Sequence, residues 1–197
     1  MPHFYLLRHG QTADDLPGKE KVTGVLATPL NQEGRREIEK ASRRLKAIGI
    51  TSITASDVKR AQQSAEIVSG YLGIPVVESP RLESWDMGSL QGILHTSAKP
   101  FLHFFAKNYD VSVPLGERFQ TFYLRWKSVW LATLKHVRMY PNSRPLLVTH
   151  SQNLDLCHWF LKGQGLGKPL DRHEQPPGSI MEIKVNDNDL KMRIING

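Results

Sequence analysis

Apolar and polar positions along the chain predict strands and helices in alternation. The short apolar run Phe4 to Leu7 is bounded by Arg-His-Gly, which is typical of a buried strand. The following helix would be capped by Asn31 and stopped by Gly49. Its apolar residues recur at spacings of three and four, at Ile38, Ala41, Leu45 and Ile48.

The same alternation continues through the middle of the chain. Ile50–Ala55 predicts the next strand, and Ser56 can cap a helix that ends at Gly73. Ile74–Val77 then predicts a third strand.

The second half begins with a less regular stretch and a long helix. This helix carries an aromatic stripe that favours core packing over a cofactor site, at Phe119, Tyr123, Trp126 and Trp130. Pro145–Thr149 predicts a strand, followed by a helix over about residues 153–161 that Gly163 closes. Ile180–Val185 and Leu190–Ile195 flank a polar turn and predict a hairpin.

Strands and helices that alternate in this way predict an open α/β sheet with helices on both faces. No repeat, low-complexity tract or Pro/Gly linker divides the chain, so we expect one domain over residues 1–197. Ligands of such sheets bind at the carboxyl ends of the strands. The residues that follow the strands are therefore the first candidates for chemistry.

Composition narrows the class of protein. With a single cysteine, Cys157, among 197 residues, a disulfide scaffold and a zinc-ribbon site are excluded. No apolar run is long enough to span a bilayer, and the first residues lack the pattern of a secretion signal, so we expect a cytoplasmic protein without membrane partners.

The charge balance favours anionic partners. Lys plus Arg number 26 against 19 acidic residues, which gives a formal net charge of +7. A basic surface suits phosphorylated metabolites, phosphoproteins or nucleic acid. Only the net charge supports nucleic-acid binding. We therefore expect a phosphorylated small molecule or a phosphoprotein as the partner.

Two arginines and two histidines fall where the predicted strands end. Arg8 and His9 follow the first strand, His150 follows the late strand, and Arg60 lies in the first turn of a helix. The planar fork of arginine matches phosphate oxygens, and a neutral histidine can attack phosphorus. Phosphoryl transfer depends mainly on positioning and charge stabilisation, so this set predicts a phosphate pocket that works through a phosphohistidine without Mg²⁺.

The same residues belong to a longer series of motifs. In chain order these are Leu-Leu-Arg-His-Gly-Gln-Thr at 6–12, Gly24 with Pro29-Leu30 and Gly34, Ser56-Asp57 to Arg60-Ala61, Gly88 to Gly92, Gly116-Glu117 and Val148-Thr149-His150. From about residue 3 to 195 the sequence resembles the phosphoglycerate-mutase-like branch of the histidine phosphatase superfamily. The resemblance implies a three-layer α/β/α sandwich with a mostly parallel central sheet. It further implies His9 as the phosphorylated nucleophile and Arg8, Arg60 and His150 as phosphate ligands.

One departure from the family pattern concerns the proton donor. The family has Glu four residues before the first Gly of the Gly88 motif, where this chain has Ser84. Asp86 is our first candidate for a replacement, because it keeps the strand-face parity of position 84, and Glu83 is the second. The alternative is that Asp86 only caps a turn and that no acid exists.

Other candidate residues flank the main motifs. Asp15 stands where many relatives have Asn, and we do not expect it to be a ligand. Ser151 predicts either a phosphate donor or a helix cap. Gln11 and Thr12 are close enough in sequence to shape the pocket, although Thr12 can instead bond to local backbone.

Residues 93–118 are the candidate lid that selects the substrate's non-phosphate part, since they hold cations and aromatics in an irregular setting. Just after Gly116, Glu117 is expected near the pocket rim, orienting an arginine, with a structural ion pair to Arg125 as the rival. The remaining histidines lack acidic or thiolate companions at ligand spacing, so we expect no metal and no other cofactor: His95, His103, His136, His158 and His173.

These observations favour a metal-independent phosphatase that acts on a phosphomonoester or a phosphoramidate. Because position 84 is a serine, a phosphate-binding sensor or interaction module with weak or no turnover remains the alternative. A phosphoglycerate-type mutase is a further alternative, and a nucleic-acid binder comes last.

Overall fold

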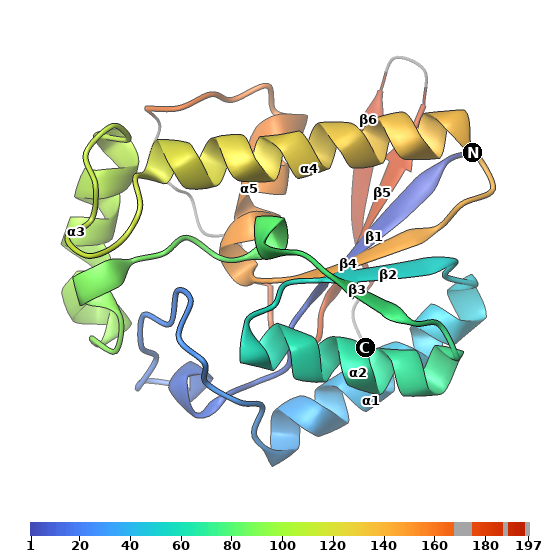
Figure 1. Ribbon diagram of the computed structural model, residues 1–197, viewed down its shortest axis with the longest axis horizontal. Coiled ribbons are helices and arrows are strands. Elements are labelled where there is room, and N and C mark those ends of the chain that lie inside the picture. The colour runs from blue at the N-terminus through green and yellow to red at the C-terminus, as the bar shows by residue number, and fades with distance from the viewer. Residues whose placement is uncertain (168–174, 187–188, 196–197) are drawn as a thin grey trace.

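The computed structural model describes residues 1–167, 175–186 and 189–195. Its strands form one six-stranded sheet in the order β3-β2-β4-β1-β5-β6 (Figure 1). The strands are β1 (His3–Arg8), β2 (Ser52–Ala55), β3 (Val76–Glu78), β4 (Pro145–Thr149), β5 (Ile180–Val185) and β6 (Leu190–Ile195). The first four pair in parallel, whereas β5 and β6 form the predicted antiparallel hairpin at one edge.

Helices cover both faces of this sheet. Figure 1 shows α1 (Gln32–Ile48) and α2 (Lys59–Leu72) on one face and α4 (Phe119–Met139) and α5 (Ser151–Leu161) on the other. Each face has its own apolar core, and the stripe of Phe119, Tyr123, Trp126 and Trp130 lies in the core beneath α4. The predicted mostly parallel, three-layer α/β/α sandwich is confirmed.

The ends of the first helix follow from local chemistry. The Asn31 side chain accepts a hydrogen bond from the Gly34 N–H at 2.8 Å, and Gly49 takes a left-handed conformation with φ 80°. Both residues act as the sequence predicts.

The start of the second helix differs from the prediction. Val58 is the N-cap of α2 and makes no side-chain cap bond, so Ser56 does not cap this helix. The Ser56 hydroxyl instead lies 3.0 Å from Nε2 of His150. The serine directly follows β2, which is paired with β4, so its side chain lies beside the residue that follows β4.

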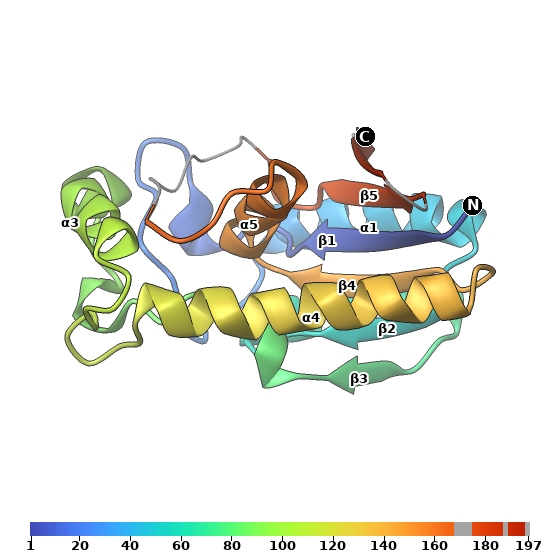
Figure 2. The same ribbon diagram turned by 90° about the horizontal axis from the view of Figure 1, so that it is seen from above.

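Residues 93–118 are more regular than expected. They contain the helix α3 (His95–Lys107), which lies beyond the carboxyl ends of the parallel strands in both views (Figure 2). Its buried residues recur every four positions, at Ala98, Leu102 and Ala106, although Pro100 lies inside the helix. Its action as a lid remains a prediction.

Short 3-10 turns complete the described chain at η1 (Ala13–Asp15), η2 (Pro80–Leu82) and η3 (Gly88–Leu90). Within the described ranges, none of the helices combines the length and apolar character that a membrane crossing requires. His173 lies outside the described residues, as do Asp187 and Asn188 of the predicted hairpin turn.

Candidate active site

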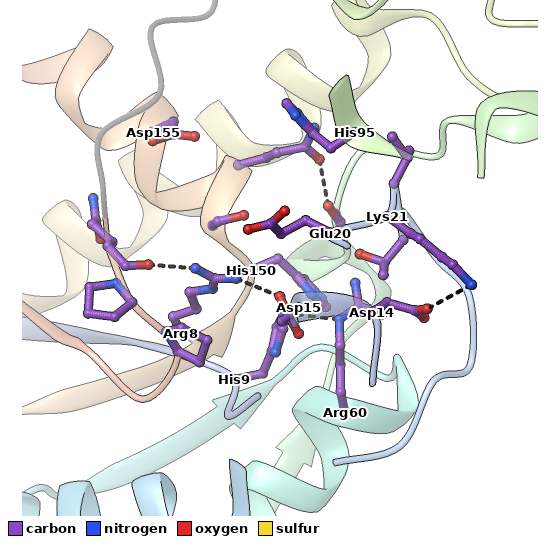
Figure 3. A pocket seen from close by; sticks show the side chains of 18 of the residues that line it. Arg8, His9, Asp14, Asp15, Glu20, Lys21, Arg60, His95, His150 and Asp155 are labelled. Carbon is purple, nitrogen blue, oxygen red and sulfur yellow. Dashed lines mark hydrogen bonds and ion pairs between the residues drawn. The ribbon is translucent and has the colours of Figure 1, made fainter. Parts of the chain in front are cut away.

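A cavity of about 650 Å³ opens at the carboxyl ends of the parallel strands, and Arg8, His9, Arg60 and His150 all line it (Figure 3). The sheet explains why residues so far apart in sequence meet there. Arg8 pairs with Thr149 in the parallel β1–β4 register, so His9 and His150 are the next residues on neighbouring strands. The His9 N–H donates to the Thr149 carbonyl at 3.0 Å, and the two imidazole ring centroids lie 5.2 Å apart.

His9 is held as a neutral imidazole. Its Nδ1 lies 2.8 Å from the carbonyl oxygen of Gly10, which can only accept, so Nδ1 carries the proton. Nε2 therefore carries no proton, and its lone pair accepts a hydrogen bond from Nε of Arg60 at 3.0 Å. Burial, followed by the positive charge of Arg60, lowers the pKa of His9 to about 3. The imidazole is thus uncharged at neutral pH, as a nucleophile must be.

Arg60 lies in the first turn of α2 and is almost fully buried. Its Nη1 donates to the Leu26 carbonyl at 2.9 Å and its Nη2 to the Gly24 carbonyl at 2.6 Å. Burial lowers the pKa of this guanidinium to about 10, which leaves it charged at neutral pH. The residue thereby joins the loop after η1 to the nucleophile candidate.

Arg8 supplies the second positive charge of the cavity floor. Its Nη2 donates to Oδ1 of Asp15 at 2.8 Å, and its Nη1 donates to the Gln175 carbonyl at 2.6 Å. Burial disfavours the ionised Asp15 carboxyl, but electrostatic interactions with His9 and Arg8 and hydrogen bonds from Thr12 outweigh burial and lower its pKa. Asp15 thus lines the cavity as the ion-pair partner of Arg8.

His150 ends β4 and is the N-cap of α5. Its Nε2 lies 3.0 Å from the Ser56 hydroxyl, whereas its Nδ1 is buried without a hydrogen-bond partner among the described residues. Burial, reinforced by the charge of Arg60, lowers the pKa of His150 well below its usual value. Ser151 and Gln152, in the first turn of α5, also line the cavity, so a helix N-terminus faces it. Ser151 is not the helix cap, because His150 holds that position.

The predicted replacements for the acid lie elsewhere. Ser84 does line the cavity, but its hydroxyl donates to Oε1 of Gln152 at 2.7 Å. The Asp86 carboxylate accepts a hydrogen bond from the Gly88 N–H at 3.0 Å, as expected if Asp86 caps a turn. Asp86 is not among the described residues that line the cavity. Residues 83–87 form no strand, so the parity argument for Asp86 does not apply.

Glu83 is also outside the cavity lining. Burial, followed by the charge of Asp57 and a side-chain hydrogen bond to it, raises the pKa of Glu83 to about 7. The two carboxyl groups thus interact with each other, away from the described cavity wall.

Three further candidates act as scaffold in this structure. Thr12 caps η1 and donates from its hydroxyl to Asp15 Oδ2 at 2.7 Å, which is the local alternative. The Gln11 side chain accepts a hydrogen bond from Asn31 at 2.9 Å. The Glu117 carboxylate forms an ion pair with Nη2 of Arg125 at 2.7 Å, which agrees with the predicted structural alternative to a position at the pocket rim. None of the three is among the described residues that line the cavity.

Several cavity residues have no motif that marks them in the sequence. They come from η1 and the loop after it, from α3, from α5 and from the segment before β5, and include Asp14, Glu20, Lys21, His95, Asp155 and Gln175. The only signal for the loop is its position directly after the Arg-His-Gly segment. Within the described ranges, no three His, Cys, Asp or Glu side chains gather as a metal site would require.

Comparison with known proteins places this geometry in a family. The sequence matches the Histidine phosphatase superfamily (branch 1) over residues 4–196. The chain belongs to this superfamily. The histidine phosphatase resemblance inferred from the motifs is therefore confirmed across almost the whole chain.

Individual relatives agree with the superfamily assignment. The chain is 33% identical over 159 residues to the probable phosphoglycerate mutase GpmB of Cronobacter sakazakii, covering 78% of this chain and 72% of that protein. YhfR of Bacillus stearothermophilus aligns with a TM-score of 0.80 at 26% identity, covering 98% and 95% of the two chains. The alpha-ribazole phosphatase of Shigella flexneri has the same fold, with a TM-score of 0.78 at 22% identity over 99% and 96%.

Proposed function

We propose that this histidine phosphatase superfamily member hydrolyses a phosphomonoester or a phosphoramidate through a phosphohistidine at His9, without a metal ion. One observation carries the proposal: the neutral His9 ring, fixed through Nδ1 by the Gly10 carbonyl, lines a cavity together with two arginines and has an unprotonated Nε2 that accepts a hydrogen bond from one of them, Arg60. The substrate would be a phosphorylated small molecule or a phosphoprotein.

Each residue of the cavity floor has a role in the proposed reaction. The His9 Nε2 lone pair forms a bond to phosphorus while the bond from phosphorus to the leaving oxygen or nitrogen breaks, and the leaving group takes a proton. Arg60 Nε, which donates to Nε2 in the free protein, would turn to a phosphoryl oxygen. Arg8, His150 and the first turn of α5 stabilise the other oxygens. Water then attacks phosphorus, the P–N bond breaks, and its electron pair returns to Nε2.

The sensor alternative has one observation in its favour. The Ser84 hydroxyl donates its proton to Gln152, so position 84 offers no acidic proton to a leaving group. A pocket without a working acid would retain phosphate esters or become phosphorylated on His9 without rapid release. The mutase alternative draws on the name of the Cronobacter sakazakii relative, probable phosphoglycerate mutase.

The test is hydrolysis of p-nitrophenyl phosphate in excess EDTA by the unaltered chain and by His9→Asn. We expect activity in EDTA and a loss of at least about 10³-fold in the variant, which keeps a polar side chain at this position. Circular dichroism of the variant checks that it folds. Undiminished turnover by the variant would refute the mechanism. A base-stable, acid-labile phosphoprotein that accumulates without phosphate release would favour the sensor. Interconversion of 2- and 3-phosphoglycerate would favour the mutase.

A further inference from the structure

Cleavage of an alkyl phosphate needs a proton for the leaving oxygen, and a carboxyl group that lines the cavity can supply it. Among the described residues, four carboxylates line the cavity: Asp14, Asp15, Glu20 and Asp155. Asp86 and Glu83 are not in this set.

Three of the four carboxylates are already engaged. Asp15 is bound by Arg8 and by Thr12. Asp14 accepts the Thr28 hydroxyl at 2.8 Å and lies 3.8 Å from the Lys21 ammonium. Asp155 is buried on α5 and also has a partner.

Glu20 differs from these three. Figure 3 shows its side chain pointing into the cavity, toward the space between Asp155 and His150. The residue is exposed, and its carboxylate makes no hydrogen bond or ion pair with any residue in the described ranges. Such a group can exchange protons with water and remains available to a bound substrate.

The backbone around Glu20 is fixed although the side chain is free. The Glu20 carbonyl accepts the His95 N–H at 2.7 Å, at the start of α3. Its neighbour Lys21 donates its N–H to the Asp14 carbonyl at 2.9 Å and forms an antiparallel bridge with Leu94. The loop after η1 and α3 are thus tied together at this point, which places the Glu20 side chain over the cavity floor.

We propose that Glu20 is the general acid and base of the reaction, in place of the group that Ser84 does not provide. The inference rests on the proposed phosphatase function. In the first step, protonated Glu20 gives its proton to the leaving oxygen as the P–O bond breaks and the His9 N–P bond forms. In the second step, the Glu20 carboxylate takes a proton from the attacking water as the N–P bond breaks, which restores the acid.

The experiment compares two leaving groups in Glu20→Gln and in a matched control, Glu66→Gln, whose glutamate is exposed on α2. p-Nitrophenolate leaves without protonation, whereas the alkoxide of β-glycerophosphate does not. Hydrolysis of the phosphohistidine is common to both substrates, so the comparison uses kcat/KM, which reports only the formation of that intermediate. For Glu20→Gln we expect kcat/KM on β-glycerophosphate to fall by about 10²- to 10³-fold and kcat/KM on p-nitrophenyl phosphate by less than about 5-fold. The control should match the unaltered chain on both substrates.

Two further readouts separate acid catalysis from a structural or binding role. With β-glycerophosphate, the pH profile of kcat/KM should differ between the unaltered chain and Glu20→Gln, because the amide has no acidic proton to give to the leaving oxygen. The conservative Glu20→Asp should recover part of the lost kcat/KM. Either result, together with the leaving-group difference, supports Glu20 as the catalytic acid.

The opposite outcomes are equally clear. Equal losses of kcat/KM on both substrates, or an unaltered chain that cannot cleave alkyl phosphates at all, would each overturn the role of Glu20. None of these results contradicts the proposed function, which is tested by the activity of His9→Asn on p-nitrophenyl phosphate. If His9→Asn were as active as the unaltered chain, both proposals would be wrong.

Discussion

Arg8 and Asp15 form an ion pair on the floor of the cavity, with Nη2 and Oδ1 2.8 Å apart. Both side chains are only slightly exposed, so solvent screens the pair weakly. The carboxylate offsets one of the two arginine charges that line the cavity. The floor therefore carries less net positive charge than its arginines alone would give.

Replacing Asp15 by Asn should tighten the binding of phosphate esters. The amide keeps a hydrogen bond to Arg8 but removes the negative charge that repels phosphoryl oxygens. We expect KM for p-nitrophenyl phosphate and the inhibition constant of inorganic phosphate to fall by about 3- to 10-fold, an effect that salt reduces. Asp110→Asn, which removes an exposed charge outside the described cavity wall, serves as the control. Unchanged constants in Asp15→Asn would show that the ion pair does not influence the phosphate site.

Arg60→Lys should be costly although it keeps the charge. Lysine cannot reproduce the fork that contacts His9 and the carbonyls of Gly24 and Leu26 together. We expect a loss of about 1–3 kcal/mol in the free energy of unfolding, from buried carbonyls left unpaired. kcat/KM should fall by about 10²- to 10³-fold. Urea denaturation and steady-state kinetics measure the two effects, with exposed Arg43→Lys on α1 expected to change neither.

The cavity floor could be predicted from sequence because it depends on topology. Residues that follow neighbouring parallel strands must meet at one edge of the sheet. For this reason the sequence could predict that Arg8, His9 and His150 lie together. The walls depend on loops, whose side-chain directions are set by contacts far away in sequence. Glu20, for example, owes its position to a backbone bond with His95, 75 residues later in the chain. The sequence contains no local signal for such a contact.

The position of Asp86 outside the described cavity lining has a similar explanation. The choice of Asp86 assumed an extended segment, but the chain turns there, and its Asp86 N–H is bound by the Glu117 carboxylate at 3.1 Å. Arg125 holds the same turn by donating to the Glu83 and Ser84 carbonyls and to Glu117. Contacts with residues about 40 positions later in the chain thus determine the local backbone geometry. The alternation of side chains along an extended strand could not predict it.

Gly34→Ala should disturb His9 from a distance. The two glycines of the motifs, Gly10 and Gly34, lie against each other, and a Cβ on Gly34 would overlap the Gln11 backbone. Gln11 lies two residues after His9, so relief of the overlap would displace the loop that fixes the imidazole. We expect a loss of about 2–3 kcal/mol in the free energy of unfolding and at least a 10-fold fall in kcat.

A second helical glycine provides the matched control for that substitution. Gly70 lies inside α2, and a Cβ there would meet no atom within 4 Å. Because alanine favours helix over glycine, Gly70→Ala should stabilise the protein by about 0.5–1 kcal/mol without altering kcat. If Gly34→Ala behaved in the same way, the tight approach of α1 to the His9 loop would not govern the site.

The buried imidazoles should make the protein sensitive to acid. The pKa of His9 falls from an ordinary 6.5 to about 3 in the folded state, so between these values the unfolded chain binds the proton and the folded chain does not. Stability is therefore lost as pH drops below 6.5, by about 2 kcal/mol for His9 at about pH 5. His150, whose pKa is also lowered, adds to the same trend.

Glu83 opposes this trend and must be separated from it. Its pKa is raised from 4.5 to about 7, so its contribution to stability is complete below pH 4.5 and disappears as pH rises through 7. Urea denaturation of the unaltered chain, His9→Asn and Glu83→Gln at about pH 7 and about pH 5 distinguishes the two groups. His9→Asn should reduce the acid-induced loss, whereas Glu83→Gln should increase it, because it removes the group that favours the folded state in acid. The exposed His136→Gln on α4 should leave the loss unchanged, and an equal loss in all four proteins would contradict the assignment of acid sensitivity to buried His9.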